Sequence, residues 1–441
     1  MAGRAGGVLV HAGAAILLLL VVAAVVASGS AAVGVVFIVL IVGLLALLVL
    51  GLERLAIVTL VIVFATAPMY RGLAGLTGGV STPTDLVLVV SVGLLLPVVI
   101  TRPLKLPTAY VVGLLLVALF GLVSAVLSDS PGGSLYGLVR WLFFLGGLPI
   151  LIAWWRPSAK TVSLLLWSYV GAHVVSTLYA IAAGPTVGNR YQGLTHHTNA
   201  FGMAGITSLA IVLYLAARHR STVARVAAGA AGVMSLLSIA LSGSRSALAV
   251  AVLLLVLVPI VERTAVSSVL VAAGVLAGAV AFPVLLHSGD GGAAFARLAG
   301  DPTAVVANSA RSNALEMGLQ RYWESPIFGS GLADVEYYHN VFLEAAIGAG
   351  VVGLVGYLLA LYALIRPLLT DHVFRRLGYL PLVFVAMGPA LPGMWDETMW
   401  VPISLSLLAA LGAVTHDPHA DAADPRTGDD VTRQQDAVRP V

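Results

Sequence analysis

Residues 339–365 read HNVFLEAAIGAGVVGLVGYLLALYALI, and this stretch sets the expected fold. The apolar run from Val341 to Ile365 contains one charged side chain, Glu344, and it exceeds the ~20 residues that a helix needs to cross a bilayer. A more polar stretch, residues 287–338, precedes it. We therefore predict a transmembrane helix that starts at the membrane surface, with the titratable ring of His339 at the boundary between water and lipid.

The composition extends this prediction to a polytopic membrane protein. Of 441 residues, 59% are hydrophobic and only 10% are charged, whereas soluble domains average about a quarter charged residues. The absence of cysteine excludes disulfides and thiolate metal ligands. We predict an all-α fold of about 12–14 transmembrane helices, because the first two apolar runs could form a hairpin and the third is short. The predicted spans are 9–28, 31–51, 55–69, 84–100, 108–127, 137–155, 161–182, 199–217, 223–241, 246–261, 265–286, 340–366, 376–392 and 399–415.

The basic residues predict how these spans are oriented. With a cytoplasmic N-terminus, 13 of the 23 lysines and arginines, including both lysines, fall in the N-terminus and the inner loops. Seven fall on the outer side and three in the tail, as the positive-inside rule requires. We expect a transmembrane domain over residues 1–415, one large outer loop at 287–338, and a disordered tail at 416–441, with both termini cytoplasmic.

The outer loop contains a candidate helix at 309–323 that Pro326 follows. Arg311 falls on the apolar face of this helix, so its guanidinium points toward the membrane and needs an anion. The alternative is an arginine that reaches toward lipid headgroups. The predicted face comprises Arg311, Leu315, Gly318, Leu319, Tyr322 and Trp323.

A second arginine, Arg245, lies in a break between two spans on the outer side. Gly243 can end the first helix, and Ser242 or Ser244 can cap the second. An arginine in the first turn opposes the helix dipole unless a phosphate binds there, held by free N–H groups and the guanidinium. A tight hairpin with a solvated arginine is the alternative. A serine hydrolase is disfavoured, because SGSRS lacks the strand–turn–helix context of a nucleophile elbow.

His339 is the candidate general base, since an imidazole with a pKa near 6.5 can remove a proton from a hydroxyl at neutral pH. Asn340 or Glu344 could orient its ring. The alternative is membership of an interfacial aromatic belt with Tyr337 and Tyr338.

Further polar groups are expected on the outer side. Residues 189–199 carry amide, imidazole and aromatic side chains suited to sugar hydroxyls, and Asn199 is placed to cap the following span. Asp396 and Glu397 are flanked by Trp395 and Trp400, either to bind a sugar or as solvated acids in an aromatic belt. The expected substrate-binding residues are Arg190, Asn199, Arg321, Asn340 and Asp396.

The sequence gives little support for a dinucleotide site or a divalent-metal site. Gly348, Gly350 and Gly353 match a dinucleotide fingerprint, but no strand precedes them. Ala345, Ala349 and Gly353 instead predict a small-residue packing face. No cluster of acids suits Mg²⁺ or Mn²⁺ beside a diphosphate, so we expect no metal. We also expect no cofactor and no nucleic-acid partner.

Four stretches together resemble the O-antigen ligase / O-antigen polymerase (Wzy-type) family. They are residues 190–202 (RYQGLTHHTNAFG), the turn 242–245 (SGSR), the outer-loop region from Arg311 to Leu332, and the segment HNVFLE at 339–344 running to Gly353. The resemblance covers residues 189–366, less than half of the chain.

The resemblance implies a GT-C-like fold in a bacterial cytoplasmic membrane and metal-independent transfer of glycan from an undecaprenyl-diphosphate donor. It implies that Arg245 and Arg311 bind the diphosphate, that His339 assists the acceptor hydroxyl, and that Asp396 is a late outer acid. Acceptors would be glycans or lipid-linked glycans, with membrane lipids, chain-length regulators or flippases as partners. The Lys-poor, Ala- and Arg-rich usage suggests a high-GC bacterium and favours a surface-polysaccharide polymerase over a ligase. A lipid-linked oligosaccharide flippase is the further alternative.

Overall fold

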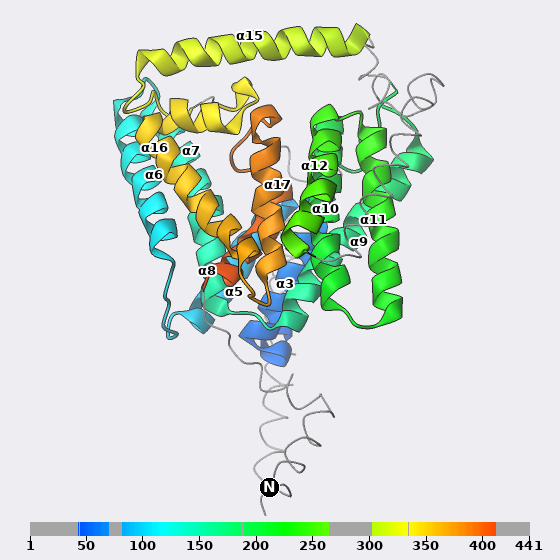
Figure 1. Cartoon of the computed structure of the whole chain (residues 1–441). Coiled ribbons are helices and arrows are strands. Elements are labelled where there is room, and N and C mark those ends of the chain that lie inside the picture. The colour runs from blue at the N-terminus through cyan, green and yellow to red at the C-terminus, as the bar shows by residue number, and fades with distance from the viewer. Residues whose placement is uncertain are drawn as a thin grey trace, which may run out of the picture.

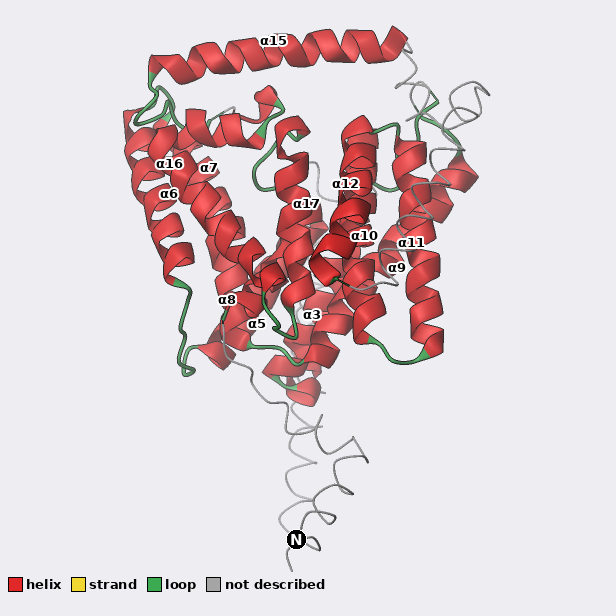
Figure 2. Cartoon of the chain, in the orientation of Figure 1, coloured by secondary structure: helices red, strands yellow, loops and turns green. Residues whose placement is uncertain are grey.

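The computed structural model describes residues 43–69 except 44, 82–186, 189–263, and 302–411 except 334. These residues form helices and loops, and no strand is present among them (Figures 1 and 2). The predicted all-α membrane fold is confirmed. The predicted spans 9–28 and 265–286, most of 31–51, and the tail at 416–441 lie outside the described residues.

Eight helical segments of the described residues are long and apolar enough to cross a membrane. They are α3 (Leu52–Thr66) with its 3-10 turn, α6 (Thr108–Leu127), α7 (Pro131–Leu142) continued by α8 (Leu148–Trp155), α9 (Ala159–Ala183), α10 (Thr198–Arg218), α11 (Thr222–Ser242), α12 (Arg245–Glu262), and α16 (Val341–Ile365) with its 3-10 turn. A π-helical turn at Phe143–Gly147 joins α7 to α8. Shorter apolar helices include α5 (Pro83–Val99).

Helices α6 and α16 pack closely because both are glycine-bearing where they meet. A Cβ added at Gly113 of α6 would lie 2.6 Å from the carbonyl oxygen of Gly356 in α16. Such backbone approach is the usual means of association between membrane helices. Small residues do form the packing face of α16, as predicted, although the closest approach uses Gly356 rather than Gly353.

A kink divides α16 at Gly350, whose φ is 69°. The loop after α15 docks into this kink. The amide of Ser330 donates to the carbonyl of Ile347 at 2.7 Å, and the amide of Val351 donates to that of Pro326 at 2.8 Å. The glycine motif of this segment therefore serves a loop contact and not a nucleotide.

The last two predicted spans, 376–392 and 399–415, correspond to shorter helical segments. α17 (Tyr379–Met387) continues into a 3-10 turn at Gly388–Ala390, and α18 (Glu397–Ile403) continues through a 3-10 turn into α19 (Leu407–Ala410). The stretch GPALPG explains where the first segment ends, because proline interrupts the helical hydrogen bonds and Gly393 adopts a φ of 82°. Residues 391–396 thereby become a loop that reaches the functional cavity.

Helix α15 (Pro302–Glu324) crosses one end of the bundle, approximately perpendicular to the other helices (Figure 1). It confirms the helix expected at 309–323 and begins earlier. Its inward face is rotated relative to the predicted one, because the small residues Ala314 and Gly318 are buried while Leu315 is 42% and Trp323 is 70% exposed. Small side chains let α15 approach α16 closely, and this contact outweighs burial of the larger ones.

Candidate active site

His339 lies between the 3-10 turn Val335–Tyr338 and α16, and its backbone φ is 53°. A left-handed non-glycine residue is strained by about 1–3 kcal/mol, which surrounding contacts must offset. Asn340 contributes to this support, because its Oδ1 accepts hydrogen bonds from the amides of Phe342 at 3.1 Å and Leu343 at 3.2 Å. The turn places the imidazole at the start of α16.

The two side chains expected to orient this imidazole are engaged elsewhere. Asn340 Oδ1 caps α16, as described above. The fully buried Glu344 uses Oε2 to accept a hydrogen bond from the amide of Gly393 at 3.0 Å. Glu344 therefore anchors the 391–396 loop against α16, and it acts on the site through that loop.

Arg245 is the first residue of α12 and follows a turn that matches the sequence prediction. Gly243 ends α11 with a φ of 66°, and Ser244 Oγ accepts a hydrogen bond from the amide of Ala247 at 3.4 Å. Arg245 Nη2 donates to Oδ1 of Asn308 in α15. This bond joins the start of α12 to the crossing helix.

The charges of Arg245, Arg311 and His339 influence one another. Burial lowers the pKa of Arg311, and the charge of Arg245 lowers it further. Burial likewise lowers the pKa of His339, and the charge of Arg311 adds to this effect. Arg245 also bonds to Asn308 of α15, the helix that carries Arg311. These interactions group the three residues at the α15 end of the bundle.

Arg190 and Asn199 contact each other in the same region. Arg190 Nη2 donates to Asn199 Oδ1 at 2.6 Å, and its Nε donates to the carbonyl of Ser242 at 2.8 Å. The 189–199 loop is thus fastened to the end of α11, next to the Arg245 turn.

The prediction that Asn199 caps α10 is wrong. The cap is His197, whose Nδ1 accepts a hydrogen bond from the amide of Asn199 at 3.1 Å. Burial lowers the pKa of His197, followed by the charge of Arg190, so a neutral ring that can accept this bond is favoured. The helix begins one residue earlier than expected, which leaves the Asn199 amide oxygen for Arg190.

Arg321 lies apart from this group. It is paired with Glu324 at 3.0 Å and with Asp129 at 3.7 Å. Ten residues of helix separate it from Arg311, which corresponds to ~15 Å along the axis. One diphosphate cannot contact both arginines, so any contact of Arg321 with substrate involves a more distant part of it.

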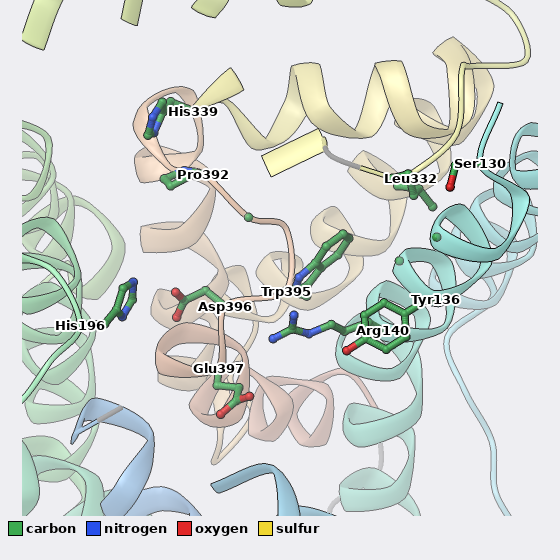
Figure 3. A pocket seen from close by; sticks show the side chains of 14 residues that line it. Ser130, Tyr136, Arg140, His196, Leu332, His339, Pro392, Trp395, Asp396 and Glu397 are labelled. Atoms are coloured by element: carbon green, nitrogen blue, oxygen red, sulfur yellow. The ribbon is translucent and has the colours of Figure 1, made fainter. Parts of the chain in front are cut away.

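A cavity of about 740 Å³ opens beside His339 (Figure 3). Its wall comes from the start of α7, the loop before α16, the 392–397 segment, and His196. Asp396 lines it and also caps α18, with Oδ1 accepting from the amide of Thr398 at 2.8 Å. Arg245 and Arg311 are not part of its lining.

Arg140 of α7 and His196 also line the cavity, and neither was singled out from the sequence as a site residue. A usable signal for Arg140 was present, because an ionisable residue inside an apolar run marks a functional position by default. Within the described part of the chain, no three histidine or acidic side chains gather as metal ligands.

Comparison with known proteins bears on the segment that holds most of this site. Residues 230–358 match the family model described as O-Antigen ligase. This range contains Arg245, Arg311 and His339, whereas Arg190 and Asp396 lie outside it. No curated protein sequence matches the chain. The family match agrees with the resemblance found in the sequence motifs, and residues 230–358 of this polytopic membrane protein are therefore similar to the O-antigen ligase family.

Proposed function

We propose that the protein transfers glycan from an undecaprenyl-diphosphate-linked donor to a sugar hydroxyl at the outer face of the bacterial cytoplasmic membrane. The activity would be that of a surface-polysaccharide polymerase. The family match supports glycan handling of the ligase or polymerase type. The donor, the acceptor and the side of the membrane belong to this proposal.

One arrangement carries the proposal: Arg245 bonds to Asn308 on α15, the helix that carries Arg311, and the charge of Arg311 helps to lower the pKa of His339. Two guanidinium groups that repel each other in a half-buried position are costly unless an anion joins them. A diphosphate is such an anion, and arginine recognises its oxygens with paired hydrogen bonds. On this proposal His339 acts on the hydroxyl that replaces the departing diphosphate.

The reaction follows from these positions. A ring nitrogen of His339 accepts the proton of the acceptor hydroxyl while its oxygen forms a bond to the anomeric carbon of the donor. The bond between that carbon and the diphosphate oxygen breaks, and undecaprenyl diphosphate departs. Because the pKa of His339 is lowered by burial and by Arg311, the ring is mostly neutral at pH 7 and able to accept the proton. Arg245 and Arg311 stabilise the charge that grows on the leaving group.

Other residues support the geometry. Arg190 and Asn199 hold the 189–199 loop beside the Arg245 turn and leave it close to the donor. Asn340 fixes the His339 turn, and Asp396 stands in the adjoining cavity. These residues, with Arg321 toward the far end of α15, remain the expected substrate contacts.

The orientation rests on the distribution of charge. The loops around Arg102, Arg156, Arg220 and Arg375 lie at the end of the bundle away from α15 (Figure 1). The positive-inside rule favours a cytoplasmic position for that end, and this supports an outer-face position for His339.

The test is transfer by purified protein in lipid nanodiscs, supplied with lipid-linked glycans extracted from a deletion strain. We expect the variant His339→Ala to lose at least about 100-fold in rate, within the range that general bases contribute. The matched control is His372→Ala, at the opposite end of the bundle, which should transfer at the rate of the unmodified protein. Full activity of His339→Ala, with normal insertion, would remove His339 as the base.

The same deletion strain distinguishes the two related functions. Mass spectrometry should reveal single lipid-linked repeats if the protein is a polymerase. Accumulation of finished lipid-linked chains would instead show a ligase that joins glycan to a different acceptor. Loss of any outer-face lipid-linked glycan, with no transfer by purified protein, would indicate a flippase.

A further inference from the structure

The cavity beside His339 contains a buried polar group that has no partner among the described residues. Trp395 is 5% exposed, and its indole N–H donates no hydrogen bond there. Glu397 is 2% exposed and its carboxyl group pairs with that of Asp85. Burial and this contact raise the pKa of Glu397 to about 9, so its carboxyl group is protonated at neutral pH. Both residues line the cavity. Buried polar atoms without partners are rare in folded proteins, so the free indole N–H indicates a ligand that supplies the missing bond.

Arg140 stands opposite these groups, on α7. Its guanidinium carbon lies 5.8 Å from the centre of the Trp395 ring, and Figure 3 shows the two side chains meeting in the cavity. No hydrogen bond or ion pair joins Arg140 to another described side chain, although the charge of Arg140 lowers the pKa of Glu397 and so opposes the larger effect of burial. Its N–H groups are thus available in the same space as the Glu397 oxygens.

The chemistry of this wall fits a sugar. Tyr136 is 68% exposed and offers an aromatic ring against which the C–H face of a pyranose can pack. Glu397 and Asp396 can accept hydrogen bonds from neighbouring hydroxyls, and Arg140 and the indole N–H can donate to ring and hydroxyl oxygens. A diphosphate is a poor fit here, because the carboxylate of Asp396 would repel it.

The position of the cavity indicates whether it binds the donor or the acceptor glycan. His339 lines it, whereas Arg245 and Arg311 do not. The reacting hydroxyl must touch His339, and the donor diphosphate must reach the arginines, so the cavity lies on the acceptor side of the reaction. We infer that Arg140, Trp395 and Glu397 form the binding site for the acceptor glycan and select it by its hydroxyl pattern. This inference rests on the proposed function and adds the substrate and the residues that recognise it.

The test separates acceptor binding from donor binding. The variants are Trp395→Phe, which keeps the ring and removes the N–H, Glu397→Gln, which keeps the shape, and Arg140→Met. Donor-side binding is measured with undecaprenyl diphosphate as the probe. Transfer is measured from purified lipid-linked glycan at fixed concentration, while membranes of the deletion strain, which supply the acceptor, are varied.

We expect each variant to bind undecaprenyl diphosphate within about twofold of the unmodified protein. Transfer at low acceptor should fall at least about tenfold, with recovery as more membranes are added, because the apparent KM for acceptor rises while kcat changes less. Arg245→Ala should show the opposite pattern, with weak binding of undecaprenyl diphosphate and no rescue by acceptor. Melting temperatures within a few degrees of the unmodified protein identify variants that fold.

Two results would overturn the inference. Unchanged transfer in all three folded variants would show that the cavity plays no part in acceptor binding. Loss of undecaprenyl diphosphate binding would assign the cavity to the donor. If Trp395→Phe fails to fold, Glu397→Gln and Arg140→Met still decide the matter. Failure of the unmodified protein to transfer any glycan is a different outcome, since it would contradict the proposed function itself.

Discussion

Glu344, in the first turn of α16, accepts a hydrogen bond from the backbone amide of Gly393 at 3.0 Å, across 49 residues of chain. The bond holds the 391–396 loop, with Asp396 at its end, against the helix that begins beside His339. The acid of the HNVFLE segment thus sets the distance between two walls of the site.

Replacing Glu344 with alanine should loosen this loop. A hydrogen bond to a charged group contributes about 1.5–3 kcal/mol, and the amide of Gly393 would lose its acceptor. We expect Glu344→Ala to reduce transfer at least about tenfold, and Glu344→Gln, which retains a carbonyl oxygen, to reduce it less. The measurement is glycan transfer in nanodiscs, with the exposed Glu316→Ala on α15 as control. Equal activity of Glu344→Ala and Glu316→Ala would show that the loop needs no such anchor.

The pH dependence of transfer should report on Arg311. Burial and the charge of Arg311 lower the pKa of His339, so the rate should stay constant through neutral pH and fall only under acidic conditions, when the base is protonated. In Arg311→Gln one cause of that lowering is removed, so the acidic fall should move to higher pH. The measurement is kcat against pH for both proteins, with Arg225→Gln as control. An unshifted profile would mean that the charge of Arg311 does not reach His339.

The packing of α15 on α16 depends on Gly318. An added Cβ would lie 2.7 Å from Leu343 Cδ2 and 2.8 Å from Tyr338 Cδ1, so Gly318→Val should push α15 outward. Arg311 would move with it. Because a misplacement of about 1 Å can cost 100-fold in rate, we expect a loss of at least about tenfold. Gln320→Val, on the opposite and exposed face, should be nearly neutral. Equal rates for the two variants would show that α15 adjusts without consequence.

The kink in α16 makes Gly350 sensitive to substitution. Alanine there would place Cβ 1.9 Å from the carbonyl oxygen of Ile327 and would require a left-handed backbone. We expect Gly350→Ala to destabilise the fold by more than ~1 kcal/mol. Gly229→Ala in α11 is the control, since no atom lies within 4 Å and alanine is the better helix former. Melting temperatures should fall for the first variant and hold or rise for the second.

The sequence predicted the long helices well, because apolar runs in a membrane protein have one stable conformation. The Arg245 turn was predictable for a local reason: Gly243 and Ser244 carry the end and start signals of adjacent helices. The 3-10 turns within the last two spans were not predicted, since hydropathy alone does not reveal where an α-helix tightens into a 3-10 turn.

The sequence predicted which residues belong to the site, but not which residues contact one another. The motifs indicated Arg245, Arg311 and His339, whereas the partners of each depend on which loops dock together. Asn199 was predicted to cap α10, but His197 is the cap. The side-chain oxygen of Asn199 instead accepts a hydrogen bond from Arg190. The role of Glu344 depends on a loop far along the chain, so no local pattern could assign it.

Two cations of the site, Arg245 on α12 and Arg311 on α15, lie outside the lining of the cavity next to His339, whereas the carboxylate of Asp396 lies within it. A molecule with one anionic end can lie across such an arrangement in a single sense only. On the proposed function, the reducing end of every incoming chain would face the arginines, and growth would always occur by insertion at that end. The polarity of the finished polymer would thus be determined by the order of charges along one wall of the protein.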